Sequence, residues 1–289
     1  MPRLLTRRKQ AWINKFKPDI LTGEPLNPNM AVADRYYSRL RAHIDKMASE
    51  VERQLKALFK NAGVEELYAQ DASIGSQARI LTNALTKKFD EVFASIAKPE
   101  AERMAVETNK ASSAAVHSSI QKLSGGLSLS TSSLTAGPMN DILTATIAEN
   151  VSLIKSISSQ YLTGVQGAVM RSITSGQGLK DLIPYLNKHK GITHRRARMI
   201  AHDQTRKAFE GLSRGRMVNL GIQEFRWLHT GGSNHPRKEH IAMSGNIYRF
   251  DEPPVIDEST GKRGYPGDLI NCRCRQQPVL RLNGEKNGS

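Results

Sequence analysis

The sequence lacks several features that mark common classes of protein. No run of about 18 apolar residues occurs, which excludes a transmembrane helix. The basic start, Met1 to Lys17, has no apolar stretch of the kind a secretory signal needs, so we expect the protein to stay in the cytoplasm where it is made. There is no Walker-type or paired-glycine nucleotide loop and no solenoid repeat, so a nucleotide-driven motor is not expected.

Cysteine is scarce, because Cys272 and Cys274 are the only two. A pair separated by one residue is a poor disulfide candidate in a reducing compartment. In an extended strand the side chains alternate between faces, so both sulfurs point the same way and Arg273 points the opposite way. Either metal binding or ordinary packing must explain the pair.

Acidic residues are also few. The 27 Asp and Glu residues face 42 Lys and Arg residues, which leaves a formal charge of +15. A polyanionic partner or an acidic protein surface is the leading inference, and a merely soluble basic protein is the alternative. The length of 289 residues allows two compact units, but a hydrophobic content of 38% is low for one core of that size, so we expect part of the chain to be extended or loosely packed.

The first half of the chain predicts an arm followed by helices. Residues 1–29 contain four prolines and scattered charges and predict a basic arm that lies on a partner or moves freely. Residues 30–123 predict a helical region with two amphipathic helices, one from about Asp34 to Asn61 ended by Gly63 and one closed by Pro99. Their apolar stripes are Leu40, Ile44, Met47, Val51, Leu55 and Leu58, and Leu81, Leu85, Phe89, Val92 and Ile96.

A segment rich in Gly, Ser and Thr, residues 124–138, predicts a linker to a second region, residues 139–289. We expect helices over 140–220: one ended by Gly176, a short one from Leu179 to Asn187, and a basic one from an N-cap at Thr193 to a stop at Gly221. Residues 222–282 predict a small turn-rich sheet that includes a strand over 224–228. The expected fold is therefore mainly α with a small C-terminal α+β module and an extended N-terminal arm.

Three motifs in the second region carry a family resemblance. They are RARMIAHDQTRKAF (196–209), WLHTGGSNHPRKEHIAMSGNIY (227–248) and YPGDLINCRCRQQPV (265–279). Their order and spacing resemble the Mu protein F-like head morphogenesis family of tailed phages, over about the last 125 residues. One departure is that His202, Asp203 and Gln204 stand where the family usually has Arg-Thr-Glu, which puts any role of that acid in doubt.

The resemblance implies a minor capsid protein of a tailed bacteriophage that acts in head morphogenesis, a virion component of the capsid interior near the portal vertex. Expected partners are the portal protein, the major capsid or scaffolding protein and double-stranded DNA without sequence preference, active during head assembly or DNA delivery, and no catalysis is expected. One alternative is a metal-dependent His-Asn-His-like nuclease, with a histidine activating water, but the expected acidic ligands are missing. Another is a free DNA-binding regulator, for which a recognition motif is missing.

A structural zinc ion is the one cofactor that the residues suggest. His235 and His240 together with Cys272 and Cys274 supply the four nitrogen and sulfur ligands of a tetrahedral site. The alternative is a pair of buried structural cysteines. For His240 a ligand or a general base competes with a histidine that donates a hydrogen bond to a backbone carbonyl.

Other residues of the second region predict structural and electrostatic roles. We expect Trp227 to anchor the small sheet against the basic helix, Gly245 to end the motif turn, Pro266 and Gly267 to form a tight turn, and Asn271 to bond its own backbone. The basic helix carries seven basic residues, including Arg196 and Arg216, matched by Asp203 and Glu210, and either contacts phosphates or presents an ordinary solvated face. Candidate DNA-contacting residues are Arg3, Arg7, Arg8, Arg195, Arg198, Arg206, Lys207 and Arg214.

Overall fold

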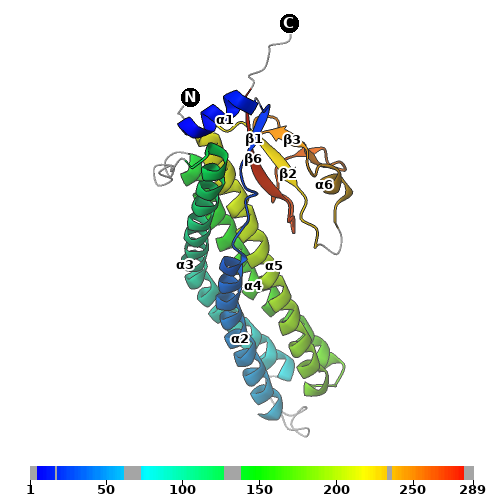
Figure 1. Cartoon of the computed structure of the whole chain (residues 1–289). Coiled ribbons are helices and arrows are strands. Elements are labelled where there is room, and N and C mark those ends of the chain that lie inside the picture. The colour runs from blue at the N-terminus through cyan, green and yellow to red at the C-terminus, as the bar shows by residue number, and fades with distance from the viewer. Residues whose placement is uncertain (1–4, 17, 62–72, 127–137, 233–235, 283–289) are drawn as a thin grey trace. The chain divides into compact units, whose positions relative to one another are not determined.

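The computed structural model describes residues 5–16, 18–61, 73–126, 138–232 and 236–282 (Figure 1). Long helices dominate, and short strands gather near the C-terminal end, which confirms the expected fold class. No helix in these ranges is long and apolar enough to span a membrane. The helices are α1 (Arg7–Phe16), α2 (Met30–Asn61), α3 (Ile74–Ser124), α4 (Pro138–Thr174), α5 (Leu179–Asn219) and α6 (Lys238–Ala242). The strands are β1 (Ile20–Thr22), β2 (Glu224–Leu228), β3 (Ile247–Arg249), β4 (Val255–Asp257), β5 (Lys262–Arg263) and β6 (Arg275–Arg281).

The chain divides into two compact units, each assembled from segments that are distant in sequence. The first comprises Met1–Val32, Met104–Thr146 and His202–Ser289, and the second comprises Ala33–Arg103 and Ile147–Ala201. The units do not follow the sequence ranges expected above, because residues of one long helix can belong to different units. Most of the expected linker, residues 127–137, lies outside the described part of the chain.

The second unit is a helical assembly whose core begins with the stripe expected on α2. Leu40, Ile44, Met47, Val51 and Leu55 are all fully buried, spaced at three and four residues. Nearby on the same helix, the Tyr36 hydroxyl lies 3.1 Å from the Asn150 side-chain oxygen. The helix runs to Asn61, whereas Gly63, its expected stop, lies outside the described residues.

The prediction that Pro99 ends the second helix is wrong, because α3 continues through it to Ser124. Pro99 has no amide hydrogen, so one carbonyl in the preceding turn of α3 loses its helix hydrogen bond. Because Pro99 lies on the exposed side of α3, neither this carbonyl nor the proline ring disturbs the packed side. The packed side continues past it through fully buried Phe93, Ala97 and Ala101. Burial on both sides of the proline therefore outweighs its local cost of about 3 kcal/mol.

The two helices expected around Thr193 form one continuous helix, α5, so the N-cap prediction is also wrong. Thr193 is buried within the helix and its hydroxyl donates to the His189 carbonyl at 2.9 Å, the i−4 bond that a mid-helix threonine makes. At the other end Gly221 is the stop that the sequence predicts. It adopts a φ of +78°, and the Ile222 amide donates back to the Met217 carbonyl at 3.0 Å, as in a Schellman cap.

The first unit contains a four-stranded antiparallel sheet in the order β1-β6-β2-β3 and a two-stranded ribbon, β4-β5 (Figure 1). The strand over 224–228 has the predicted bounds. The expected N-terminal arm lies on this sheet instead of moving freely. β1 pairs with β6, and the amide of buried Leu26 donates to the Gln276 carbonyl at 2.8 Å, because the apolar residues of the arm find cover there.

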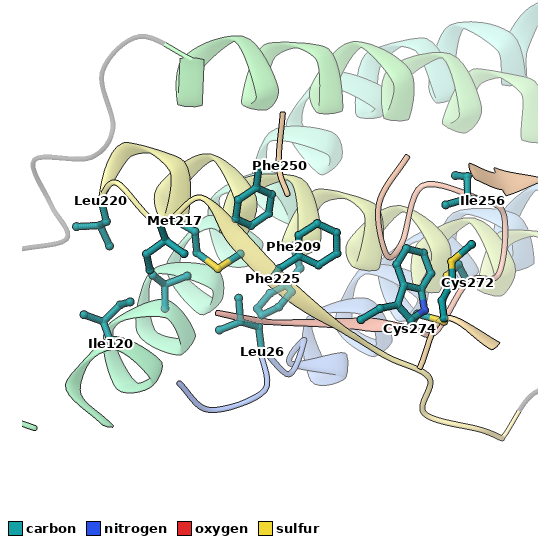
Figure 2. Close-up of a cluster of buried hydrophobic side chains, with 14 residues drawn as sticks. Leu26, Ile120, Phe209, Met217, Leu220, Phe225, Phe250, Ile256, Cys272 and Cys274 are labelled. Atoms are coloured by element: carbon teal, nitrogen blue, oxygen red, sulfur yellow. The ribbon is translucent and has the colours of Figure 1, made fainter. Parts of the chain in front are cut away.

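One hydrophobic core joins this sheet to α3 and α5 within the first unit. Figure 2 shows Phe209, Phe225 and Phe250 gathered in the core, with Cys272 and Cys274 at one end of it. The Phe225 and Phe250 rings stack with centroids 4.9 Å apart. Because the segments that carry the cysteines are short and irregular, this core fixes where their sulfurs point.

Candidate metal centre

Four side chains from three segments of the first unit converge at the end of this core. Cys272 and Cys274 lie just before β6, His240 lies in α6, and His229 directly follows β2. Cys272 and Cys274 are buried while Arg273 between them is exposed, which is the alternation expected of extended backbone.

The distances between the nitrogen and sulfur atoms are short. His240 Nδ1 lies 3.5 Å from the Sγ atom of Cys272 and 3.5 Å from that of Cys274. His229 Nδ1 lies 3.6 Å from the Sγ atom of Cys274. The ligand atoms of His240 and the two cysteines all lie within 4.8 Å of one another. The arrangement can therefore present several donors to one ion.

The His240 ring is oriented by its surroundings. Its Nε2 atom lies 3.2 Å from the Ile256 carbonyl of β4. A carbonyl only accepts hydrogen bonds, so Nε2 carries the hydrogen and the lone pair of Nδ1 faces the two sulfurs. The Trp227 ring packs edge-on against the imidazole at 5.1 Å. The carbonyl-bonded histidine and the ligand histidine, which were alternatives in the sequence, are thus compatible in one side chain.

The two thiols differ in how readily they lose a proton. The hydrogen bond with Cys274 lowers the pKa of the Cys272 thiol, against the effect of burial, and the same bond raises the pKa of Cys274. The Gly267 amide also donates to the Cys272 sulfur at 3.4 Å. Cys272 is therefore the first of the pair to reach the thiolate form that binds metals.

The loop before Cys272 is held in place by two residues with positive φ and by contacts with α5. Asn271 adopts a φ of +59°, and its amide donates to the Asp203 carboxylate of α5 at 2.6 Å. Gly267 has a φ of +90°, and a Cβ there would lie 2.9 Å from Cγ of Glu210. Pro266 is buried beside it. Asp203, at the position of the family departure, thus holds the main chain at Asn271, and the expected bond of Asn271 to its own backbone stays a prediction.

A buried, hydrogen-bonded pair, Glu210 and Gln276, lies next to this loop. Gln276 Nε2 donates to Glu210 Oε2 at 2.8 Å, and both side chains are almost fully buried. Burial raises the pKa of the Glu210 carboxyl well above its usual value, against the hydrogen bond from Gln276, which lowers it. The pair is a structural feature that sequence reasoning missed, because nothing in the local pattern marks Glu210 as inward-facing.

The expected fourth ligand, His235, lies outside the described residues. His229 lies beside Cys274 and was not considered as a candidate ligand from the sequence. Its signal was present in the Trp227-Leu228-His229 motif, because the strand places Trp227 in the core and ends just before His229. Gly245, with a φ of +92°, donates its amide to the Trp227 carbonyl at 2.8 Å and so closes the turn of the second motif.

The candidate DNA-contacting residues differ in their surroundings. Arg7 and Arg8 on α1 and Arg195 and Arg198 on α5 are exposed. The rest of the described set is half-buried: Lys207 lies 3.7 Å from Asp203, Arg214 stacks on the Tyr265 ring at 3.9 Å, and Arg206 is partly covered. Arg3 lies outside the described residues.

Arg216 does not belong to the surplus of outward-facing charge that the basic helix predicts. It is 1% exposed and donates to the Ser112 hydroxyl at 2.8 Å and to the Leu212 carbonyl at 3.4 Å. Burial lowers the pKa of its guanidinium to about 10. Arg216 therefore stabilises contact between α3 and α5 within the first unit.

The acidic residues near the ribbon have their own partners. Asp251 pairs with Arg249 at 2.7 Å, and Asp257 accepts hydrogen bonds from Ser259. Within the described ranges, the group of His, Cys, Asp and Glu side chains close enough to share an ion consists of His240, Cys272 and Cys274. The carboxylates that a metal-dependent nuclease needs are not gathered with them in this part of the chain.

Comparison with known proteins finds similarity in sequence. Residues 163–277 match the family described as Phage Mu protein F like protein. An uncharacterized protein of Haemophilus influenzae (strain ATCC 51907 / DSM 11121 / KW20 / Rd) is 30% identical over 286 residues, which is 98% of this chain and 59% of the relative. The uncharacterized protein YqbB of Bacillus subtilis (strain 168) is 25% identical over 125 residues, 40% of this chain and 41% of the relative. The chain thus spans less than two thirds of the length of these relatives, and no solved structure matches it.

Proposed function

Because residues 163–277 form a Mu protein F-like domain, we propose that the chain is a minor head protein of a tailed bacteriophage that acts in head morphogenesis. The family match is the observation that carries the proposal. It covers α5, the sheet strands β2 and β3, and all four side chains of the candidate metal centre. The protein is expected in the virion, in the capsid interior near the portal vertex.

The charge distribution supports polyanionic or acidic partners. The net charge is +15, and exposed arginines occur on α1 and on α5. Phosphate contacts from such residues are independent of base sequence and weaken as the salt concentration rises, because fewer counterions are then released on binding. We propose that the chain contacts the portal and the capsid or scaffolding protein, and double-stranded DNA without sequence preference.

The surroundings of His240 support a role without catalysis. The residue is 3% exposed, its Nε2 atom lies against a carbonyl, and its Nδ1 atom faces two sulfurs. A general base must reach a substrate or a water molecule with a free nitrogen. His240 is buried and both of its nitrogens face groups of the protein itself, so the nuclease alternative gains no support from it.

The proposal is tested by deleting the gene from an inducible lysogen that carries it and examining the particles after induction. We expect procapsids that fail to mature or fill with DNA, and recovery when the intact gene is supplied in trans. In the complemented strain, the chain should sediment with procapsids and co-purify with portal protein. Infectious, DNA-filled particles in the deletion strain, or absence of the chain from every particle fraction, would overturn the proposal.

A further inference from the structure

We infer that His229, His240, Cys272 and Cys274 bind one zinc ion tetrahedrally, and that the ion joins the end of β2, α6 and the segment before β6. The inference does not depend on the proposed role in head assembly. It replaces His235, expected from the sequence, with His229 as the fourth ligand.

The first argument is the spacing of the donor atoms. In tetrahedral zinc sites the metal lies about 2.3 Å from sulfur and about 2.0 to 2.1 Å from nitrogen, so neighbouring nitrogen and sulfur ligands are about 3.5 to 3.6 Å apart. The three nitrogen–sulfur distances here are 3.5, 3.5 and 3.6 Å. The donors of His240, Cys272 and Cys274 thus already stand close together around one point, and His229 reaches this group through its contact with Cys274.

The second argument is the chemistry of the donor set. Two thiolates neutralise the charge of a divalent ion, and two neutral imidazoles complete the combination that zinc prefers over magnesium or calcium. His240, Cys272 and Cys274 are buried, with at most 4% of each residue exposed. With all four positions filled by protein, the site has no place for a reacting water and is structural.

The third argument is that neighbouring groups already orient the ligands. The Ile256 carbonyl accepts from His240 Nε2, the arrangement by which metal-binding histidines are usually fixed. The Gly267 amide donates to the Cys272 sulfur at 3.4 Å. A backbone donor directed at the Cys272 sulfur stabilises its thiolate, which is the state that metal binding needs.

The fourth argument is that the segments around the centre have little stability of their own. The strands around the centre are short, three residues in β3 and β4 and two in β5, and such pieces give little cross-strand stability. A metal ion that joins separate segments supplies the stability that a small core lacks. We therefore expect removal of zinc to loosen this part of the first unit and to leave the helical second unit folded.

The test uses the full-length chain, purified without chelator and compared with single variants. We expect one equivalent of zinc by elemental analysis, and cobalt substitution to give the intense visible bands of a tetrahedral site with thiolate ligands. His229→Ala, His240→Ala and Cys272→Ser should each lower zinc affinity at least tenfold. His43→Ala, in the second unit, is the matched control and should keep full zinc content.

His235→Ala separates the two assignments of the fourth ligand. We expect it to bind zinc as the unchanged chain does, whereas loss of zinc from His235→Ala with retention in His229→Ala would overturn the assignment of His229. A second test needs no variant and so does not depend on how well the variants fold. In the unchanged chain, a chelator should make residues near β6 sensitive to protease, and added zinc should reverse this. A full-length chain without zinc that neither takes up cobalt nor responds to chelator would overturn the site altogether.

Discussion

At the scale of single residues, the sequence indicated that the two sulfurs lie together but did not single out His229 beside them. Alternation along an extended strand placed Cys272 and Cys274 on one side, since this depends only on local backbone geometry. The assignment of His229 depends on how the end of β2 lies against α6, a relation between segments that spacing alone does not contain. His235 was favoured because it is close to His240 in sequence.

The buried carboxyl of Glu210 predicts a pH-dependent contribution to stability. Burial raises its pKa well above the usual 4.5, so the folded state prefers the neutral acid. The contribution is full below the usual pKa and is lost as the pH rises toward the raised value, by about 1.4 kcal/mol for each pH unit in that window. Glu210→Gln, which stays neutral, should therefore gain stability relative to the unchanged chain as the pH rises.

The measurement is urea unfolding of both proteins at several pH values from about 4.5 to 8, a range that begins near the unfolded pKa of a glutamate, with the same metal content in each. Exposed Glu91→Gln is the control and should follow the unchanged chain throughout. A constant difference between Glu210→Gln and the unchanged chain at every pH would show that Glu210 is ionised in the folded protein.

At the scale of elements, amphipathic stripes were predicted well and helix ends less well. The apolar stripe of α2 was predicted correctly, because a helix with one buried side repeats its apolar residues at intervals of three and four. Pro99 and Thr193 were mistaken for boundaries because local preference is weak compared with burial of long helix faces on both sides. Gly221 was predicted because its positive φ is a local requirement.

Pro99→Ala should stabilise the chain, because it restores a helix hydrogen bond on the exposed side of α3 without changing the core. We expect a gain of about 1 to 3 kcal/mol in the free energy of unfolding. The neighbouring Lys98→Ala is the control and should change it by less than about 0.5 kcal/mol. Thermal and urea unfolding measure both, and a decrease in stability in Pro99→Ala would mean that a bend at Pro99 is required.

Two glycines with positive φ should respond differently to alanine. At Gly221 a Cβ meets nothing within 4 Å, so Gly221→Ala costs only the strain of left-handed backbone, about 1 to 2 kcal/mol. At Gly267 a Cβ would also lie 2.9 Å from buried Glu210, so Gly267→Ala should cost more and also weaken zinc binding through Cys272. Equal decreases in the stability of the two variants would indicate that the loop moves freely away from Glu210.

At the scale of the whole molecule, composition predicted polyanionic or acidic partners, which stays a prediction, and the motifs predicted the family that the comparison finds. Neither indicated the two discontinuous units, because the contacts that define them join segments far apart in sequence. The count of basic residues also overstated the exposed charge, since Arg216 is buried and Arg214 is stacked on Tyr265.

Binding to double-stranded DNA should depend strongly on salt and not on sequence. In Arg195→Glu/Arg198→Glu the slope of log affinity against log salt should fall by about 0.9 for each phosphate that the variant no longer neutralises. Arg53→Glu/Lys56→Glu changes the net charge equally, but those two residues already pair with Glu50 and Glu52. Fluorescence anisotropy with two unrelated duplexes measures the slopes, and equal slopes in the two double variants would exclude Arg195 and Arg198 as phosphate-binding residues.

The pairing of β1 with β6 sets an order of events during synthesis. Gln277 donates to the Gly23 carbonyl across 254 positions, so β1 leaves the ribosome long before the strand that completes its hydrogen bonds. Pairings between such distant positions form slowly. Until then the edge of β1 is open to other chains, so a nascent polypeptide halted before β6 should aggregate more readily than one released after it.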